Sequence, residues 1–173
     1  MQDNTLLKSI EATCWRILRE VSPAQQSVAY RATYTSEDYI LKLLKHHNVQ
    51  FPPNLLEAIN ASQPPTIDFF KRLPLIHGKL WAVYVLVLEK EGELPAIYVG
   101  KSTHNKGYFH RLHQHDTGER TAYWVEKRIS EGFTITHRAT LAWASIPSDP
   151  TGTDQVRLTG LVLLLETMFA LRF

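Results

Sequence analysis

The stretch WAVYVLVLE, residues 81–89, is followed six residues later by AIYVGKS, residues 96–102. The first stretch is rich in β-branched and aromatic residues and is apolar on both faces, which predicts a central strand. The intervening KEGELP, residues 90–95, is polar and contains Gly and Pro, which is typical of a hairpin loop. We therefore predict an antiparallel hairpin at the centre of a small sheet.

The segments that follow this hairpin complete an α+β pattern. Residues 106–114 and 121–130 predict two helices, and Gly132 is expected to close the second of them. Residues 134–146 alternate between polar and apolar side chains, as a third strand would, and residues 155–173 form a strongly apolar helix. The order β-β-α-α-β-α predicts a small three-stranded antiparallel sheet flanked by helices.

The residues before the hairpin have a different, helical character. We expect a helical N-terminal region over residues 1–75 and an α+β domain over residues 76–173. Helices are predicted from Thr5 to Val21, from the capping-box motif Thr35-Ser36-Glu37-Asp38 onward, and from the Pro52-Pro53 and Pro64-Pro65 pairs to Ile59 and Phe70.

Composition narrows the class of protein. The chain has 173 residues, a formal net charge of +2 and one cysteine, Cys14, so an intramolecular disulfide scaffold and a cysteine zinc site are excluded. The N-terminus does not resemble a signal peptide, and the apolar run LVLLLETMFAL is too short to cross a membrane and contains Glu166. We expect a protein without a membrane anchor, inside the cell, in the nucleus or the cytoplasm.

Five residues stand out as a candidate site. Tyr84 and Tyr98 lie on the two strands of the hairpin, and Arg111 and His115 are four residues apart, so they share one helix face. Glu166 interrupts an apolar helix, where a carboxylate is costly unless it binds a metal or pairs with a basic residue. Singly, the tyrosines also fit a core, the arginine a solvated helix and the histidine a surface helix end.

Together these residue types suit phosphodiester hydrolysis. A carboxylate such as Glu166 can hold Mg²⁺, which acts as a Lewis acid and a template. The guanidinium of an arginine such as Arg111 matches two phosphate oxygens. A tyrosine beside a cation can orient a water molecule or accept its proton.

In this order, the motif residues resemble the GIY-YIG nuclease family, with Ala82-Val83-Tyr84 in place of GIY and Tyr98-Val99-Gly100 in place of YIG. The resemblance covers residues from about Ile76 to the C-terminus. It implies an endonuclease that cuts DNA with Mg²⁺ or Mn²⁺ and uses Tyr84, Tyr98, Arg111, His115 and Glu166, with Glu166 as the metal ligand. It also implies that Tyr84 or His115 accepts the proton, and the sequence leaves both open.

Two departures from the family pattern leave alternatives open. Ala82 replaces the first glycine, and the family usually has an asparagine well beyond the glutamate, whereas this sequence ends seven residues after Glu166. We therefore expect a fragment of a longer protein. The alternatives to a nuclease are a catalytically inactive DNA-binding module and a protein-interaction module with the same fold.

Basic residues outside the motif are candidate DNA contacts. Lys101 and Lys106 flank the site and, with Arg111, are expected to contact phosphates. For the helix with Tyr123, Trp124, Lys127 and Arg128, we favour aromatic core residues beside a solvated basic face. For His46-His47, after Lys45 at a predicted helix end, we favour an interaction with the helix dipole.

Overall fold

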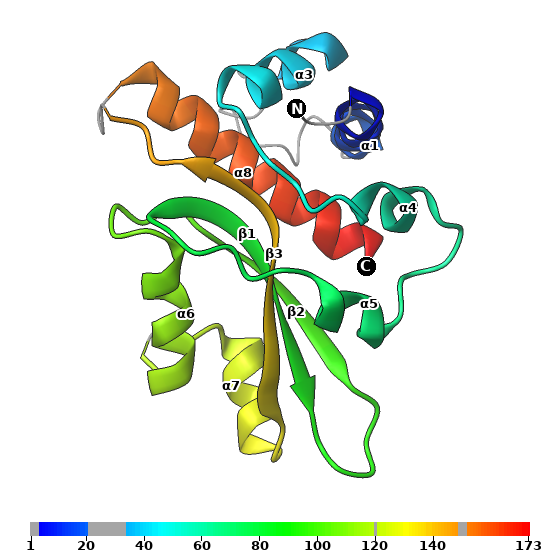
Figure 1. The fold of residues 1–173 in the computed structure, drawn as a ribbon, viewed down its shortest axis with the longest axis vertical. Helices are drawn as coiled ribbons and strands as arrows, with labels where there is room; N and C mark the ends of the chain where they lie inside the picture. Colours follow the sequence, from blue (N-terminus) through cyan, green and yellow to red (C-terminus); the bar gives the residue numbers. More distant parts are fainter. Residues whose placement is uncertain (1–3, 21–33, 120, 149–151) are drawn as a thin grey trace.

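The computed structural model describes residues 4–20, 34–119, 121–148 and 152–173 (Figure 1). The strands are β1 (Leu80–Glu89), β2 (Ala96–Ser102) and β3 (Thr134–Ser145). The helices of the N-terminal region are α1 (Asn4–Glu20), α3 (Glu37–His46), α4 (Leu55–Asn60) and α5 (Ile67–Arg72). Those of the C-terminal half are α6 (Tyr108–Thr117), α7 (Tyr123–Ser130) and α8 (Thr153–Arg172).

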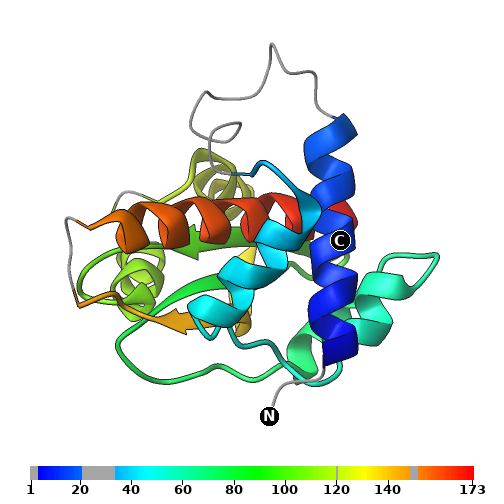
Figure 2. The ribbon, with the colours of Figure 1, turned by 90° about the horizontal axis from the view of Figure 1, so that it is seen from above.

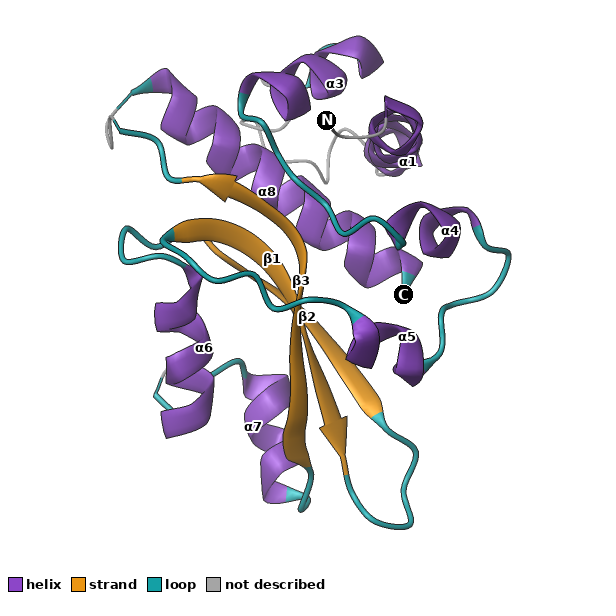
Figure 3. Ribbon diagram, in the orientation of Figure 1, coloured by secondary structure: helices purple, strands orange, loops and turns teal. Residues whose placement is uncertain are grey.

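The three strands form one antiparallel sheet in the order β2-β1-β3 (Figure 3). Eight consecutive residues of β1 are buried, from Trp81 to Leu88, because β1 has a neighbour on each side and helices on both faces. The predicted α+β class, the three-stranded antiparallel sheet and the order β-β-α-α-β-α are confirmed. Gly132 follows α7 with φ +92°, a conformation that favours glycine.

Alternate residues of β1 belong to two different apolar clusters. Val83, Val85 and Val87 pack with α8 and the N-terminal helices. Tyr84 and its alternate neighbours pack with residues of α6 and α7, so these helices cover the opposite face of the sheet (Figure 1). This separation follows from the two-residue period of a strand.

Helix α1 packs against α3, α4 and α8, and it crosses α8 steeply (Figure 2). Helix α3 also contacts α8, whereas α5 contacts β1 and β3. At the C-terminal end of α8, Arg172 donates hydrogen bonds to the carbonyl oxygens of Ile59, at 2.6 Å, and of Ala61. Gln50 exchanges two backbone hydrogen bonds with Trp143, at 2.8 and 3.0 Å, on the outer edge of β3. The helical region is therefore joined both to α8 and to the sheet.

Local details at the start of α3 differ from the sequence-based expectation. The predicted capping box is not formed, because Ser36 is itself the N-cap and its hydroxyl donates to the Asp38 carboxylate at 2.5 Å. The predicted end of the first helix at Val21 lies outside the described residues. Among the helices that the structure describes, none has the length and apolar character needed to span a membrane.

Candidate active site

Tyr84 is the centre of the candidate site. It lies on the middle strand, on the face covered by α6, and its side chain is fully buried. On the neighbouring strand its partner is Gly100, while Tyr98 lies opposite Leu86, two positions along. Tyr84, Gly100 and Tyr98 thus share one face of the hairpin.

Gly100 allows the two tyrosine rings to lie over its backbone. A Cβ atom at this position would lie 2.6 Å from Cε1 of Tyr98 and 2.8 Å from both Cζ and Oη of Tyr84. Such distances are shorter than van der Waals contact, so any side chain here would displace a ring. The glycine of the YVG tripeptide is therefore needed for close approach on a strand and not for a turn.

Helix α6 contributes the next two residues. His115 is buried, and its Nε2 lies 2.8 Å from the hydroxyl oxygen of Tyr84. Arg111, one turn earlier, donates to the Gln114 side chain at 3.2 Å and also interacts with Tyr84 through its charge and a hydrogen bond. The shared helix face is confirmed. The surface position that a histidine at a helix end suggests when taken singly is not found, because His115 packs against the sheet.

The electrostatic environment keeps both members of this pair neutral at pH 7. Burial lowers the pKa of His115 to about 4, and the positive charge of Arg111 adds to this effect. Burial also raises the pKa of Tyr84, an effect to which Tyr98 and Glu166 add and which Arg111 opposes. His115 is thus an uncharged imidazole next to a protonated phenol.

Tyr98 is the third aromatic residue of the site. Its ring centroid lies 5.8 Å from that of His115 in an edge-on arrangement. Burial and the charge of Glu166 raise its pKa, while Arg111 lowers it. The two tyrosines, Arg111 and His115 form one cluster on the α6 face of the sheet.

Glu166 reaches this cluster from a different direction. Helix α8 covers the opposite face of the sheet from Tyr84. The Glu166 carboxylate lies at the edge of β2, where it accepts a hydrogen bond from the Lys101 backbone and has Nζ of Lys101 at 3.8 Å. Lys101 is next to Gly100 on β2, so the carboxylate lies at the rim of the sheet beside the cluster, and its charge raises the pKa of both tyrosines.

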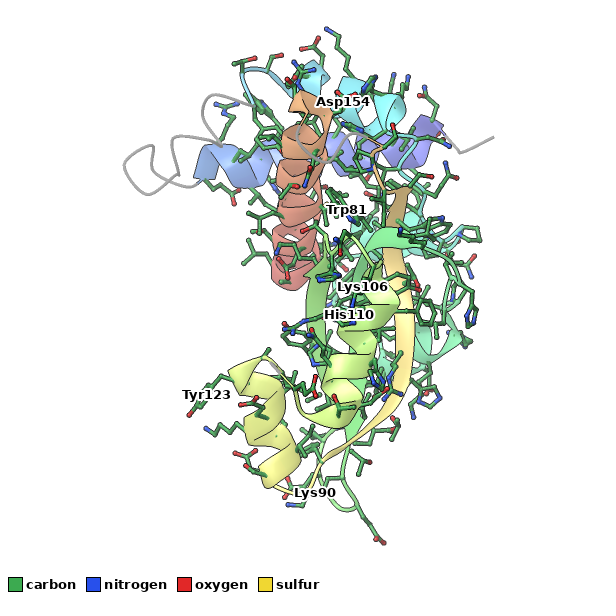
Figure 4. The ribbon with its side chains drawn as sticks, turned by 90° about the vertical axis from the view of Figure 1, so that its left-hand side faces the viewer. Trp81, Lys90, Lys106, His110, Tyr123 and Asp154 are labelled. Carbon is green, nitrogen blue, oxygen red and sulfur yellow. The ribbon has the colours of Figure 1, made fainter. Side chains whose placement is uncertain are left out.

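The two lysines expected to contact phosphates lie in different settings. Lys101 is on β2 and pairs with Glu166, so the alternative of a salt-bridged Glu166 is realised in this structure. Lys106 is exposed in the turn before α6, where its backbone N–H donates to Nδ1 of His104 at 3.1 Å. Figure 4 shows its position next to His110. Only Lys101 is part of the site cluster.

Trp124 is a site neighbour that the sequence analysis placed in the core. It is 36% exposed, and its ring stacks on Tyr98 with centroids 6.2 Å apart and 20° between planes. Arg128 lies 5.4 Å above the same indole ring. Tyr123 is 80% exposed and projects from α7 (Figure 4), so the prediction of two core aromatic residues is wrong.

Comparison with models of protein families, with curated proteins and with solved structures gave no match. The chemical interpretation of the site therefore depends on its geometry. The cluster offers a neutral imidazole, two phenols, a guanidinium and a carboxylate at the rim of the sheet. These groups can move a proton, bind a phosphate and hold a hard cation.

Proposed function

We propose that the protein is a metal-dependent endonuclease that hydrolyses phosphodiester bonds in DNA. The observation that supports this most is the buried hydrogen bond between Tyr84 and His115, next to Arg111 and Tyr98. A neutral histidine held against a tyrosine hydroxyl is a proton acceptor with a defined donor. Because DNA is the proposed substrate, we also place the protein inside the cell.

The first step assigned to the chain's own residues is proton removal from water. With His115 protonated at Nδ1, its Nε2 accepts the hydroxyl proton of Tyr84. Because Tyr84 is buried in this structure, a water molecule has to enter the site before it can donate to the Tyr84 oxygen. It can then lose its proton to that oxygen as the phenol proton moves to His115. In this scheme Tyr84 contacts the nucleophilic water and His115 is the final proton acceptor. Both candidates for the proton acceptor, between which the sequence did not decide, therefore take part.

Arg111 is placed to bind the phosphate that is attacked. Its guanidinium interacts with the Tyr84 hydroxyl, so a phosphate oxygen bound to Arg111 would lie close to the nucleophilic water. Charge-assisted hydrogen bonds to phosphate oxygens stabilise the charge that develops during hydrolysis. Lys101 adds a second positive charge at the same edge of the sheet.

Glu166 fits the role of a single carboxylate ligand for Mg²⁺ or Mn²⁺. Burial raises its pKa, so a cation next to it would stabilise the charged form. Mg²⁺ commonly takes one or two carboxylates and fills its remaining positions with water and substrate phosphate, where it stabilises negative charge on phosphoryl oxygens. Lys101 holds the carboxylate in the structure and would be freed to contact DNA.

Nicking of supercoiled plasmid tests the proposal. The full chain is incubated with plasmid and Mg²⁺ or Mn²⁺, with EDTA as the metal-free control. Wild type should nick the DNA, and Tyr84→Phe should not. The matched control is Tyr108→Phe, which removes another buried phenol on α6, bonded to Ile76 and Thr140, and should retain nicking. Equal nicking by both variants would contradict the proposal.

The ion pair between Lys101 and Glu166 favours one alternative, a DNA-binding module without catalysis. An ammonium group next to the carboxylate neutralises the charge that a metal would need. Such a module would bind DNA with an affinity that falls steeply with salt, yet would leave it uncut at every Mg²⁺ concentration. A protein-interaction module would do neither.

A further inference from the structure

A group of side chains that could hold a metal ion lies far from the candidate active site. His46 ends α3, His47 is the next residue, and Asp154 is in the first turn of α8. One ligand atom from each of the three lies within 4.8 Å of the other two. Figure 4 shows Asp154 near α3, at the opposite end of the molecule from Tyr123.

The donor atoms already approach a coordinating arrangement. Nε2 of His46 lies 3.3 Å from Oδ2 of Asp154. Two ligands of a tetrahedral zinc ion with bonds of about 2.0–2.1 Å lie roughly 3.3 Å apart. One ligand atom of His47 lies within 4.8 Å of a ligand atom of His46 and of Asp154.

The second observation that points to a ligand is at His47. Its Nε2 is shielded from solvent and has no hydrogen-bond partner. A buried nitrogen without a partner costs free energy, and a metal bond would satisfy it. Arg157 lies 3.8 Å from the other Asp154 oxygen, so it orients the carboxylate and leaves Oδ2 for the ion.

We propose that His46, His47 and Asp154 bind a divalent transition-metal ion of the zinc type. Two imidazoles and one carboxylate suit Zn²⁺, Co²⁺ or Ni²⁺, whereas Mg²⁺ and Ca²⁺ prefer oxygen ligands. Water fills the remaining position, as in sites with three protein ligands. The C-terminal end of α3 also favours positive charge.

The ion would join the N-terminal helices to α8. Its ligands come from helices that are more than a hundred residues apart in the sequence, and α3 and α8 pack in the same core. Glu166 is on the same helix as Asp154, twelve residues later, which corresponds to about 18 Å. The proposed ion is therefore separate from any ion at the candidate active site.

Isothermal titration with Zn²⁺ on the tag-free, EDTA-dialysed full chain tests this site. Wild type should bind one Zn²⁺ with an increase in melting temperature, and bound Co²⁺ should show the visible absorption of a tetrahedral complex. Asp154→Asn and His47→Ala should each bind Zn²⁺ at least about tenfold more weakly, in line with the loss of a ligand. Their circular dichroism in EDTA should match that of wild type.

Two control variants separate this site from other binding. His113→Ala removes an exposed imidazole on α6, and Glu126→Gln removes an exposed carboxylate on α7. Both should bind Zn²⁺ like wild type. The proposal is overturned if wild type binds no Zn²⁺, if Asp154→Asn and His47→Ala keep full affinity, or if His113→Ala or Glu126→Gln weakens binding as much as they do.

Discussion

The hydroxyl oxygen of Tyr84 lies 2.8 Å from Nε2 of His115, which joins the middle strand of the sheet to helix α6 through a buried hydrogen bond. Nδ1 of the same imidazole is shielded from solvent and has no hydrogen-bond partner. The hydrogen bond to Tyr84 is thus a principal polar contact of the His115 ring. Changes at either residue should affect both stability and the proposed chemistry.

Replacing Tyr84 by Phe should lower the free energy of unfolding by about 1–3 kcal/mol, because Nε2 of His115 loses its buried partner. DNA nicking should fall by about 10²–10⁴-fold, the usual contribution of general acid–base catalysis. Urea unfolding and plasmid nicking measure the two effects. In the double variant with His115→Leu the two stability losses should be less than additive, and full additivity would show that the pair is not coupled.

The stability of the fold should depend on pH through His115. Its pKa is about 4 in the folded chain and about 6.5 when unfolded. The unfolded state therefore binds the proton first, so stability is fully present above about pH 6.5 and is lost as pH falls towards 4, by roughly 3 kcal/mol at most. Urea midpoints at pH 7 and 4.5 should differ less in His115→Gln than in wild type. An equal difference in both proteins would contradict the assigned pKa.

Replacing Gly100 by Ala should destabilise the fold by about 1–3 kcal/mol, since the new methyl group would overlap both tyrosine rings. The loss should shrink when Tyr98 is also replaced by Ala, which removes one of the two rings. As a control, Gly160→Ala in α8 should cost less stability than Gly100→Ala, because alanine favours a helix and the nearest atom to the added methyl group is the Tyr34 hydroxyl oxygen, at 3.3 Å. Thermal melts compare the three variants.

The strands and the local motif could be predicted from the sequence because their signals are local. β-branched runs and a polar hairpin loop define β1 and β2, and a two-residue period then places Tyr84, Gly100 and Tyr98 on one face. The four-residue spacing likewise placed Arg111 and His115 together. The sequence did not indicate that His115 is buried, because its helix neighbours Gln114 and Asp116 are polar and its ring packs against Tyr84 and Tyr98 of the sheet.

The remaining relationships join segments that are distant in the sequence. Nothing in the α8 sequence indicates that Glu166 reaches the outer edge of β2, since this depends on how α8 crosses the sheet. The stacking of Trp124 on Tyr98 depends in the same way on where α7 lies. His46-His47 suited a helix end, and its approach to Asp154 follows from the packing of α3 on α8.

Glu166→Gln should separate the metal-ligand role from a structural one. The carboxylate is partly exposed and 3.8 Å from Lys101, so the loss of this pair should change stability by less than about 1 kcal/mol. Nicking should nevertheless fall by orders of magnitude, because a metal contributes several kcal/mol to charge stabilisation and each 1.36 kcal/mol corresponds to about tenfold in rate.

The matched control for Glu166 is Lys101→Met, which breaks the same ion pair but keeps the carboxylate. It should need less Mg²⁺ for half-maximal nicking, because the metal no longer competes with an ammonium group. Melting curves with and without Mg²⁺ complete the comparison. A large stability loss in Glu166→Gln, with no Mg²⁺ effect on wild type, would favour the structural role.

The alternation of β1 between two cores limits how this chain can change in length. Insertion or loss of one residue between positions 82 and 88 would shift the strand register, so that the valines would face α6 and Tyr84 would face α8. A single such change would therefore disrupt the packing of both apolar clusters and the geometry of the site. The hairpin loop at residues 90–95 has no such constraint, since it contacts solvent. Related chains should therefore differ in length at this loop and match residue for residue along β1.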